Sequence, residues 1–483
     1  HTKERIKVSQ RIPNFFKQLK VFCTRDLLSK LSDKQYLLIN LIQAPLLALF
    51  MTFLVRYYAT IERDSPHYTF YENDNIPVYF FMSIIVALFM GLTVSAEEIF
   101  RDRKILKRER FLNLSKGSYL LSKIMILFGL SAVQTATFVL VGNFVLGLSS
   151  MGLSFWMILF SCSCFSNMLG LNISASFNSA VTIYILIPLL LIPQLLLSGV
   201  VINFDKFNPS VSTMDGVPIV GEMMASRWAF EAALVTQYKD NPYEKIFFHL
   251  DKAAADAEYK KLYYIPRLQS ELSNAFVNLR FKLNPEVAVG IRNSLEILRN
   301  EITYELEVVG NDKFDHMDRL IIERFDSTTY VGTKTFLNKL RKMYANQYLK
   351  VESEKTALAN SLTDTPQKKR ELDSLKFAYQ NEAIVTTLVN KNTPFRVIEI
   401  DNELVRKIYP IYFTDHKPAH LLDFRSKFYV PVKHFLDYYI DTLYFNIGMI
   451  WFMTALLFVT LYNNALKRLI KKLTSKKTRL GAN

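Results

Sequence analysis

Few side chains in this sequence have a type and spacing suited to chemistry, and the clearest pair is His416 and His420. Two imidazoles four residues apart on one helix face can share a metal ion. Pro418 lies between them, in the segment DHKPAH, and prevents the regular helical turn that would align them. We therefore expect no metal at this pair.

No catalytic constellation is visible elsewhere in the sequence. The chain has no G-x-x-x-x-G-K-[ST] phosphate loop, no nucleophile elbow and no Ser-His-Asp order. Its three cysteines, Cys23, Cys162 and Cys164, all precede residue 203, so we expect the long segment after that residue to fold without disulfides. We also expect no cofactor in this chain.

Charged side chains are concentrated in residues 96–119, AEEIFRDRKILKRERFLNLSKGSY. This segment also carries large apolar residues that an ordinary loop would not need: Ile99, Phe100, Ile105, Leu106 and Phe111. The pattern predicts a short amphipathic helix that docks on a cytoplasmic partner through an apolar anchor, with charged flanks that set the register. A solvated loop, oriented by its positive charge, is the alternative interpretation.

Apolar runs long enough to cross a membrane must position this loop, since about 20 helical residues span a bilayer core. They cover residues 36–57, 76–96, 119–148, 155–174, 181–202 and 438–462. The fifth run contains Pro188 and Pro193, which predict a kink. The fold class is therefore an α-helical polytopic membrane protein with six transmembrane helices.

An amphipathic stretch precedes the first run. Its apolar positions recur at spacings of three and four residues and are Phe15, Phe16, Leu19, Phe22, Cys23, Leu27 and Leu31. Because Lys17, Lys20, Arg25 and Lys30 occupy the other faces, the stretch predicts an interfacial helix along the inner leaflet. A simple basic lead-in to the first span is the alternative.

Basic residues are distributed along the chain as a topology signal. There are nine Lys and Arg before the first run, seven in residues 101–116 and seven in residues 467–479. The positive-inside rule then places both termini in the cytoplasm and residues 203–434 outside. The net charge of +15 is explained by these flanks, so we expect no nucleic acid as a partner.

The predicted spans are almost without ionisable groups, which disfavours a proton- or ion-coupled carrier. They contain amides that more often join helices than bind a substrate. These are Asn40, Gln43, Gln134, Asn143, Asn167, Asn172, Gln194 and Asn446. A pathway with this lining favours bulky, amphipathic or apolar cargo.

The long segment between the fifth and sixth runs is predicted to be mostly helical. Asn284 and Pro285 form a cap and first-turn pair, and Thr365 with Pro366 starts another helix. One apolar stripe contains Val287, Ile291, Leu295, Leu298 and Ile302, and a second contains Phe336, Leu340, Met343, Tyr344, Tyr348, Val351, Leu358 and Leu362. We interpret both stripes as the core of this domain or as a helical hairpin, with a partner-binding face as the alternative.

Short motifs resemble the type-2 export permeases of the ABC superfamily, and most of all the half-transporters of its G subfamily. In KRERFLNLSKGSY, Arg108, Glu109, Gly117 and Tyr119 match that family's R-E pair followed by G-x-Y. LLLSGVVINF is similar to its S-G segment, at Ser198, Gly199, Val200, Val201 and Asn203. SRWAFEA, with Arg227, Phe230 and Glu231, and YFNIGMI, with Asn446, are similar to two further motifs.

The resemblance implies a dimer of two copies with the substrate cavity on the two-fold axis. It also implies that the interfacial helix, with Arg25, and the charged loop transmit motion from ABC ATPase domains. The residues in the loop would be Arg108, Glu109, Arg110, Phe111 and Tyr119. Val200 and Val201 would form a hydrophobic valve. In the G subfamily an ATPase that binds ATP and Mg²⁺ precedes the permease in one polypeptide, so the nucleotide-binding domain is expected upstream of His1 or in a separate subunit. A long outer loop without cysteines fits a bacterial protein.

The predicted organisation has five parts. Residues 1–35 form a cytoplasmic lead-in with the interfacial connecting helix, and residues 36–202 carry spans one to five with the coupling loop 97–118. Residues 203–435 form an extracytoplasmic domain, residues 436–466 the sixth span and residues 467–483 a basic cytoplasmic tail. The first functional hypothesis is a multi-pass exporter permease of the inner membrane. The second is an ABC-type mechanotransmission or signalling protein that drives an envelope partner of residues 203–435 and moves no cargo.

Overall fold

A computed structural model describes residues 14–57, 68–108, 115–213, 216–310, 314–413, 425 and 427–480, with the backbone alone for residues 474–480. The histidines His416 and His420, considered above as a metal pair, lie outside these ranges. So do Glu109, Arg110 and Phe111 of the predicted coupling loop.

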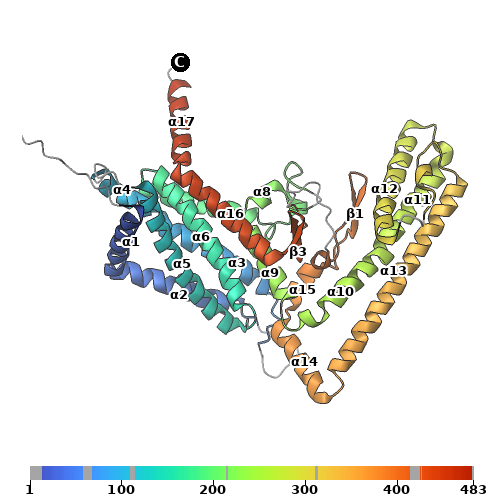
Figure 1. The fold of residues 1–483 in the computed structure, drawn as a ribbon, viewed down its shortest axis with the longest axis horizontal. Helices are drawn as coiled ribbons and strands as arrows, with labels where there is room; N and C mark the ends of the chain where they lie inside the picture. The colour runs from blue at the N-terminus through green and yellow to red at the C-terminus, as the bar shows by residue number, and fades with distance from the viewer. Residues whose placement is uncertain are drawn as a thin grey trace, which may run out of the picture.

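The membrane part of the fold consists of helices from both ends of the chain. They are α1 (Phe15–Ser32), α2 (Lys34–Val55), α3 (Ile76–Ser95), α4 (Glu98–Arg108), α5 (Lys116–Leu146), α6 (Gly152–Ser176), α7 (Ala180–Leu196), α16 (Thr442–Tyr462) and α17 (Ala465–Leu480). Figure 1 shows α16 lying beside α6 and α17 projecting beyond the end of the bundle. The chain therefore returns to the first bundle for its last apolar helix.

Five helical segments of the described residues are long and apolar enough to cross a membrane: α2, α3 with its continuation α4, α5, α6 and α16. They coincide with five of the six predicted spans. The remaining one, α7, is apolar but has only 17 residues. At about 1.5 Å per residue it extends about 26 Å, slightly less than the hydrocarbon core of a typical bilayer.

The predicted fifth span, residues 181–202, ends too late. α7 continues through Pro188 and Pro193 but stops at Leu196. The chain then turns at Gly199, whose φ of 78° lies in the left-handed region that favours glycine. The predicted apolar run extends past the end of α7 because the residues of the turn that follows are themselves apolar.

The predicted sixth span, residues 438–462, begins too early. Strand β4 (Tyr438–Asp441) pairs with β3 (Val432–Phe435), and α16 starts only at Thr442. Leu436 and Asp437 have φ values of 50° and 62°, as in the tight turns that join two strands. The apolar residues of β4 extend the run of α16, and hydropathy does not distinguish a strand from a helix over so few residues.

Small residues let the membrane helices pack closely. A Cβ atom built on Gly91 of α3 would lie 2.1 Å from the Ser166 Oγ of α6. One built on Gly170 of α6 would lie 2.0 Å from the Ser95 Oγ of α3. Glycine at both positions therefore allows the two backbones to approach as helices do in membranes.

Side-chain amides form hydrogen bonds between other helices of the bundle, as the sequence predicted. Gln134 Nε2 of α5 donates to the Asn40 carbonyl of α2 at 2.9 Å. Asn172 Nδ2 of α6 donates to the Leu457 carbonyl of α16 at 2.9 Å. These bonds tie the returning helix α16 and the peripheral helix α2 to the centre of the bundle.

Residues 203–435, called here the loop domain, are mostly helical. Their helices are α8 (Ile219–Glu222), α9 (Ala225–Lys239), α10 (Glu244–Tyr259), α11 (Ile265–Asn278), α12 (Pro285–Val309), α13 (Ser327–Leu362), α14 (Pro366–Tyr379) and α15 (Glu382–Val389). A π-helical turn, η3 (Lys260–Tyr264), joins α10 to α11, and β1 (Val397–Ile400) pairs antiparallel with β2 (Glu403–Arg406). Short 3₁₀ turns are η2 (Phe204–Lys206), η4 (Leu279–Phe281), η6 (Met317–Arg319) and η7 (Pro410–Tyr412). In Figure 1, α10 to α13 form an arm that extends to the right of the membrane helices.

Two predicted helix starts in this arm are confirmed. The Asn284 side chain accepts the Glu286 N–H at the start of α12, and Thr365 caps α14 in the same way. The apolar stripe of α12 is buried at Ile291, Leu295, Leu298 and Ile302. Most of it therefore belongs to the core of the loop domain.

The loop domain is attached firmly to the membrane helices. Helix α9 is buried from Ala225 to Tyr238 and packs on α16, α6 and α3. Asn381, the N-cap of α15, donates to the carbonyls of Phe70 and Asn73 at 2.8 Å each, in the segment just before α3. The loop domain is thus attached to the membrane helices at two places.

Candidate functional site

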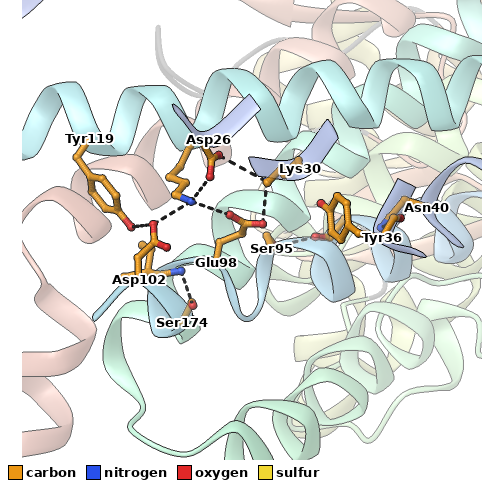
Figure 2. A network of polar contacts seen from close by, with 12 residues as sticks. Asp26, Lys30, Tyr36, Asn40, Ser95, Glu98, Asp102, Tyr119 and Ser174 are labelled. Carbon is orange, nitrogen blue, oxygen red and sulfur yellow. Dashed lines mark hydrogen bonds and ion pairs between the residues drawn. The ribbon is translucent and has the colours of Figure 1, made fainter. Parts of the chain in front are cut away.

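Helices α1, α4 and α5 each direct ionisable side chains toward one point (Figure 2). Asp26 and Lys30 lie four residues apart on α1, and Glu98 and Asp102 four residues apart on α4. Residues with this spacing lie on the same helix face. Lys123 comes from the second turn of α5, and we call these five residues the lysine network.

Lys123 is at the centre of the lysine network. Its Nζ lies 2.6 Å from Asp26 Oδ1, 3.0 Å from Glu98 Oε2 and 2.9 Å from Asp102 Oδ2. Lys30 Nζ lies 2.8 Å from the other oxygen of Glu98. Each carboxylate therefore contacts Lys123, and the five side chains connect three helices.

The network is buried, which makes its pairing energetically significant. Lys123 is 4% exposed and Glu98 is 7% exposed. An ionised group removed from water is tolerated only when it is paired, and loss of one partner of a buried pair typically costs about 3–5 kcal/mol. The network therefore opposes the separation of α1, α4 and α5.

Helix α4 is also fixed to the end of α6. Ser174 Oγ accepts the N–H groups of Ile99 and Phe100 at 3.0 and 2.9 Å, which satisfies donors in the first turn of α4. Arg103 Nη2 donates to the carbonyls of Ser174 and Ala175 at 2.9 and 3.0 Å. A cation at this end of α6 also complements the helix dipole. A movement of α4 thus reaches two long apolar helices, α5 and α6.

A second buried cluster lies where α9, α16 and β3 meet. Glu231 Oε2 lies 2.8 Å from Lys433 Nζ and 3.4 Å from Arg227 Nη1, and it accepts from Asn446 Nδ2 at 2.9 Å. Glu231 Oε1 accepts the Tyr429 N–H at 3.0 Å. All four side chains, Arg227, Glu231, Lys433 and Asn446, are fully buried. We call them the signature cluster.

Opposite charges determine the ionisation of this cluster. Burial by itself would raise the pKa of Glu231, but Arg227 and Lys433 outweigh burial and hold this pKa below its ordinary value. Burial, aided by Arg227, lowers the pKa of Lys433 to about 8 even though Glu231 opposes the change. Glu231 is therefore an anion that neutralises two cations on different elements.

The comparison with known families decides what this membrane bundle is. Residues 17–238 match the model of the ABC-2 type transporter family, and this range contains α1 to α9 almost completely. This part of the chain is a type-2 ABC permease domain. No curated protein matches the chain. Permease domains of this family normally pair with an ATPase, and the chain is a multi-pass membrane protein.

The permease places three of the predicted coupling residues within its described part. Tyr119 is buried, and its hydroxyl donates to Asp102 Oδ2 of the lysine network at 3.0 Å. Arg25 is exposed on α1, with its guanidinium 5.3 Å from the centre of the Phe22 ring. Arg108 is exposed at the end of α4. Tyr119 therefore joins the network, while the two arginines face outward.

The predicted amphipathic helix exists as α4, but its apolar anchor is already occupied. Ile99 is buried in a cluster with Phe22 and Tyr119, so it packs on the permease and not on a partner. The sequence pattern could not show this, because an apolar stripe does not identify the surface that covers it. The exposed residues of α4 are basic: Arg101, Lys104, Lys107 and Arg108.

Most of the lysine network was not predicted from the sequence. Lys123 lies inside the predicted third span, where a lysine is costly and therefore informative. The pairs Glu98 with Asp102 and Asp26 with Lys30 have the four-residue spacing that places both members on one helix face. These two signals together would have indicated a buried ionic contact. Lys433 had no comparable signal in the sequence, because it lies outside the predicted spans.

The motif residues fall into two groups in the permease. Arg227, Glu231 and Asn446 meet in the signature cluster, and Phe230 beside them packs edge-on against the Phe81 ring at 5.6 Å. The others occupy the turn after α7, where Ser198 and Gly199 are buried, Val200 is half-buried, and Val201 and Asn203 are exposed. The predicted valve pair thus lies in a turn, beyond the end of the helix.

Proposed function

We propose that this chain is the permease of an ATP-driven exporter, similar to the half-transporters of the ABC G subfamily. It moves an apolar or amphipathic substrate out of the cytoplasm or the inner leaflet of a bacterial inner membrane, with both termini in the cytoplasm. The single observation that carries the proposal is the lysine network. It connects the predicted interfacial helix, the predicted coupling helix and a membrane helix through Lys123.

The network supports a specific path for coupling. The basic exposed face of α4, with Lys104 and Arg108, binds an acidic groove of the ATPase. When ATP and Mg²⁺ close the ATPase domains, α4 is displaced. Because separation of Lys123 from Glu98 or Asp102 would leave buried charges unpaired, α5 and α1 move together with α4.

A second copy of the chain completes the proposed cavity. α7 has an exposed apolar face formed by Val181, Tyr184, Ile185, Leu189, Ile192 and Leu196. An exposed apolar face of this kind can be covered by lipid or by a second copy of the chain. Val200 and Val201 follow α7 directly and would close the cavity on the outer side, as the valve predicted from the sequence.

The test of this proposal is the ATPase activity of the full-length gene product in lipid nanodiscs. Envelope lipids and hydrophobic drugs are screened for stimulation in the native protein and in the double variant Lys104→Glu, Arg108→Glu. Lys350→Glu, a charge reversal at an exposed position of α13, is the matched control. We expect one class of compound to stimulate the native and control proteins and not the double variant. Equal stimulation of all three would contradict the proposed coupling path.

A mechanotransmission function is the second candidate, and the attachment of the loop domain favours it. Asn381 ties α15 to the segment before α3, and α9 is buried among the membrane helices. In this case the permease drives the loop domain against an envelope partner and moves no cargo. ATPase activity that is indifferent to every compound but altered by Asn381→Ala would favour this function over export.

A further inference from the structure

A cavity of about 300 Å³ lies between the turn that follows α7 and the loop domain. Gly199 and Asp205 line it from the segment that follows α7, and Asn390 lines it from the end of α15. Arg406 and Lys407, at the end of β2, complete the wall together with Lys427, Phe428 and Tyr429. The cavity therefore joins the outer end of the permease helices to the loop domain.

Arg406, which lines both this cavity and an adjoining one, has an unsatisfied donor. The side chain is only 5% exposed, its Nε donates to the Ile408 carbonyl, and its Nη1 lies 2.9 Å from Asp256 Oδ1. Nη2 has no hydrogen-bond partner among the residues that the structure describes. The guanidinium packs over the Tyr259 ring, 4.5 Å from its centre, but a ring face does not replace a hydrogen-bond acceptor. Because a buried unpaired donor is costly, an acceptor that enters the cavity would be stabilised by this nitrogen.

The charges around the cavity favour an anion. Among the described residues that line it, three side chains are cationic, Arg406, Lys407 and Lys427, and one is a carboxylate, Asp205. Lys407 Nζ lies 3.2 Å from Asp205 Oδ1, whose side chain is 60% exposed, so this pair is weak enough for an anion to share. Lys427 Nζ donates to the Arg406 carbonyl at 3.3 Å and thereby stays at the wall.

An adjoining cavity shows why the anion belongs in the first one. The second cavity, of about 320 Å³, shares Val405, Arg406 and Lys427 with the first. Its remaining charged residues are mostly acidic: Asp256, Lys260, Glu301, Glu305 and Glu403. An anion near Arg406 is therefore repelled on that side and attracted on the side of Lys407.

We propose that the first cavity binds a phosphate group, with Arg406 Nη2 as its buried donor and Lys407 and Lys427 as its charge partners. A guanidinium combined with ammonium groups is the usual protein partner of phosphate oxygens. The phosphate is carried by a lipid headgroup or is free in solution. A carboxylate, with a single negative charge, matches three cations less well.

The position of the site relates it to the proposed function. Gly199 precedes the valve pair Val200 and Val201, and Asp205 follows it, so an anionic headgroup that leaves between two permease copies meets this cavity next. Its role in release rests on the proposed export function. The binding of phosphate does not, because the cavity is formed within one chain.

Equilibrium binding tests the proposal without ATPase activity. The full-length protein in uncharged detergent is titrated calorimetrically with inorganic phosphate, short-chain phosphatidic acid and short-chain diacylglycerol. Binding of the phosphatidic acid alone identifies a lipid headgroup, and binding of inorganic phosphate as well identifies a general phosphate site. Diacylglycerol, which lacks the phosphate, should not bind. If neither phosphate compound binds, or if diacylglycerol binds as tightly as phosphatidic acid, the proposal is wrong.

Two variants and a control assign the binding to this cavity. Lys407→Gln should weaken binding about 10-fold, since one charge-assisted hydrogen bond is lost. Arg406→Gln should abolish it, and its thermal unfolding is measured in parallel because Arg406 also pairs with Asp256. If that variant does not fold, Lys407→Gln carries the test. Arg396→Gln, at an exposed position outside the cavity, should bind normally. Unchanged binding in Lys407→Gln would refute the assignment.

Discussion

Replacement of Lys123 by methionine is the most direct test of the lysine network. Methionine keeps a long unbranched side chain but removes the only group that contacts Asp26, Glu98 and Asp102 at once within the described part of the chain. The substitution therefore leaves several carboxylates near one another without their shared cation. Among the described residues, Lys30 still compensates them, at 2.8 Å from Glu98 Oε1 and 3.7 Å from Asp26 Oδ2, and the Tyr119 hydroxyl still donates to Asp102.

The expected loss of stability follows from the burial of these groups. Removal of one partner of a buried ion pair costs about 3–5 kcal/mol. The lower part of this range, about 3 kcal/mol, applies to Lys123→Met, because water reaches a carboxylate such as Asp102, whose side chain is 20% exposed. The double variant Lys123→Met, Asp102→Asn should recover about 1–2 kcal/mol of this loss, as residues in one network are coupled.

Thermal unfolding in nanodiscs, followed by tryptophan fluorescence, measures these differences. The ATPase assay is run on the same samples, where Lys123→Met should lose stimulation by substrate. Lys350→Met, which removes an exposed lysine of α13, far from the network in the sequence, is the control and should change neither quantity. If Lys123→Met unfolds at the same temperature as the control and keeps its stimulation, the network neither stabilises nor couples the three helices.

Three further predictions, made with four variants, test other parts of the structure. Glu231→Gln leaves Lys433 buried without the carboxylate that it contacts and leaves Arg227 with Glu222, 3.3 Å from its Nη1, so it should cost about 3–5 kcal/mol. Lys433→Met should cost much less, because Arg227 then keeps both carboxylates. Burial raises the pKa of Glu244 from 4.5 to about 7, so the folded state binds this proton more tightly than the unfolded chain and loses stability as the pH rises through this range. Glu244→Gln removes that loss, and its stability relative to the native protein should increase by about 3 kcal/mol from pH 4 to pH 8. Gly199→Ala should cost about 1–3 kcal/mol, because the residue has a φ of 78° and the added Cβ would lie 2.4 Å from a neighbouring ring.

Thermal unfolding also measures these three effects, and each variant is compared with a matched variant or with the native protein. Equal losses for Glu231→Gln and Lys433→Met would contradict the role of Glu231 as the shared anion. A difference between Glu244→Gln and the native protein that stays constant with pH would contradict the raised pKa. Gly290→Ala, at a glycine of α12 with open space around it, is the control for Gly199→Ala and should be neutral or stabilising.

The sequence predicted the helices of this protein well where their signal is local. Apolar runs identified α2, α3, α5, α6 and α16, because a helix in lipid must be apolar over its whole length. The caps at Asn284 and Thr365 were predicted from the side chain and the proline that follows it. Errors occurred at the ends of two runs, at Gly199 and at β4, where the residues of a turn or a strand are also apolar.

Tertiary structure alone decided which charges meet. Asp26, Glu98 and Lys123 lie on three helices, and no local pattern contains the register between them. Arg227 and Glu231 formed a recognisable motif, but Lys433 joins them from a distant strand. The sequence by itself determined a polytopic membrane protein with the motifs of an ABC permease, since both follow from composition and local order. The buried ionic contacts required the fold, because charges far apart in sequence become partners only when packing removes water from between them.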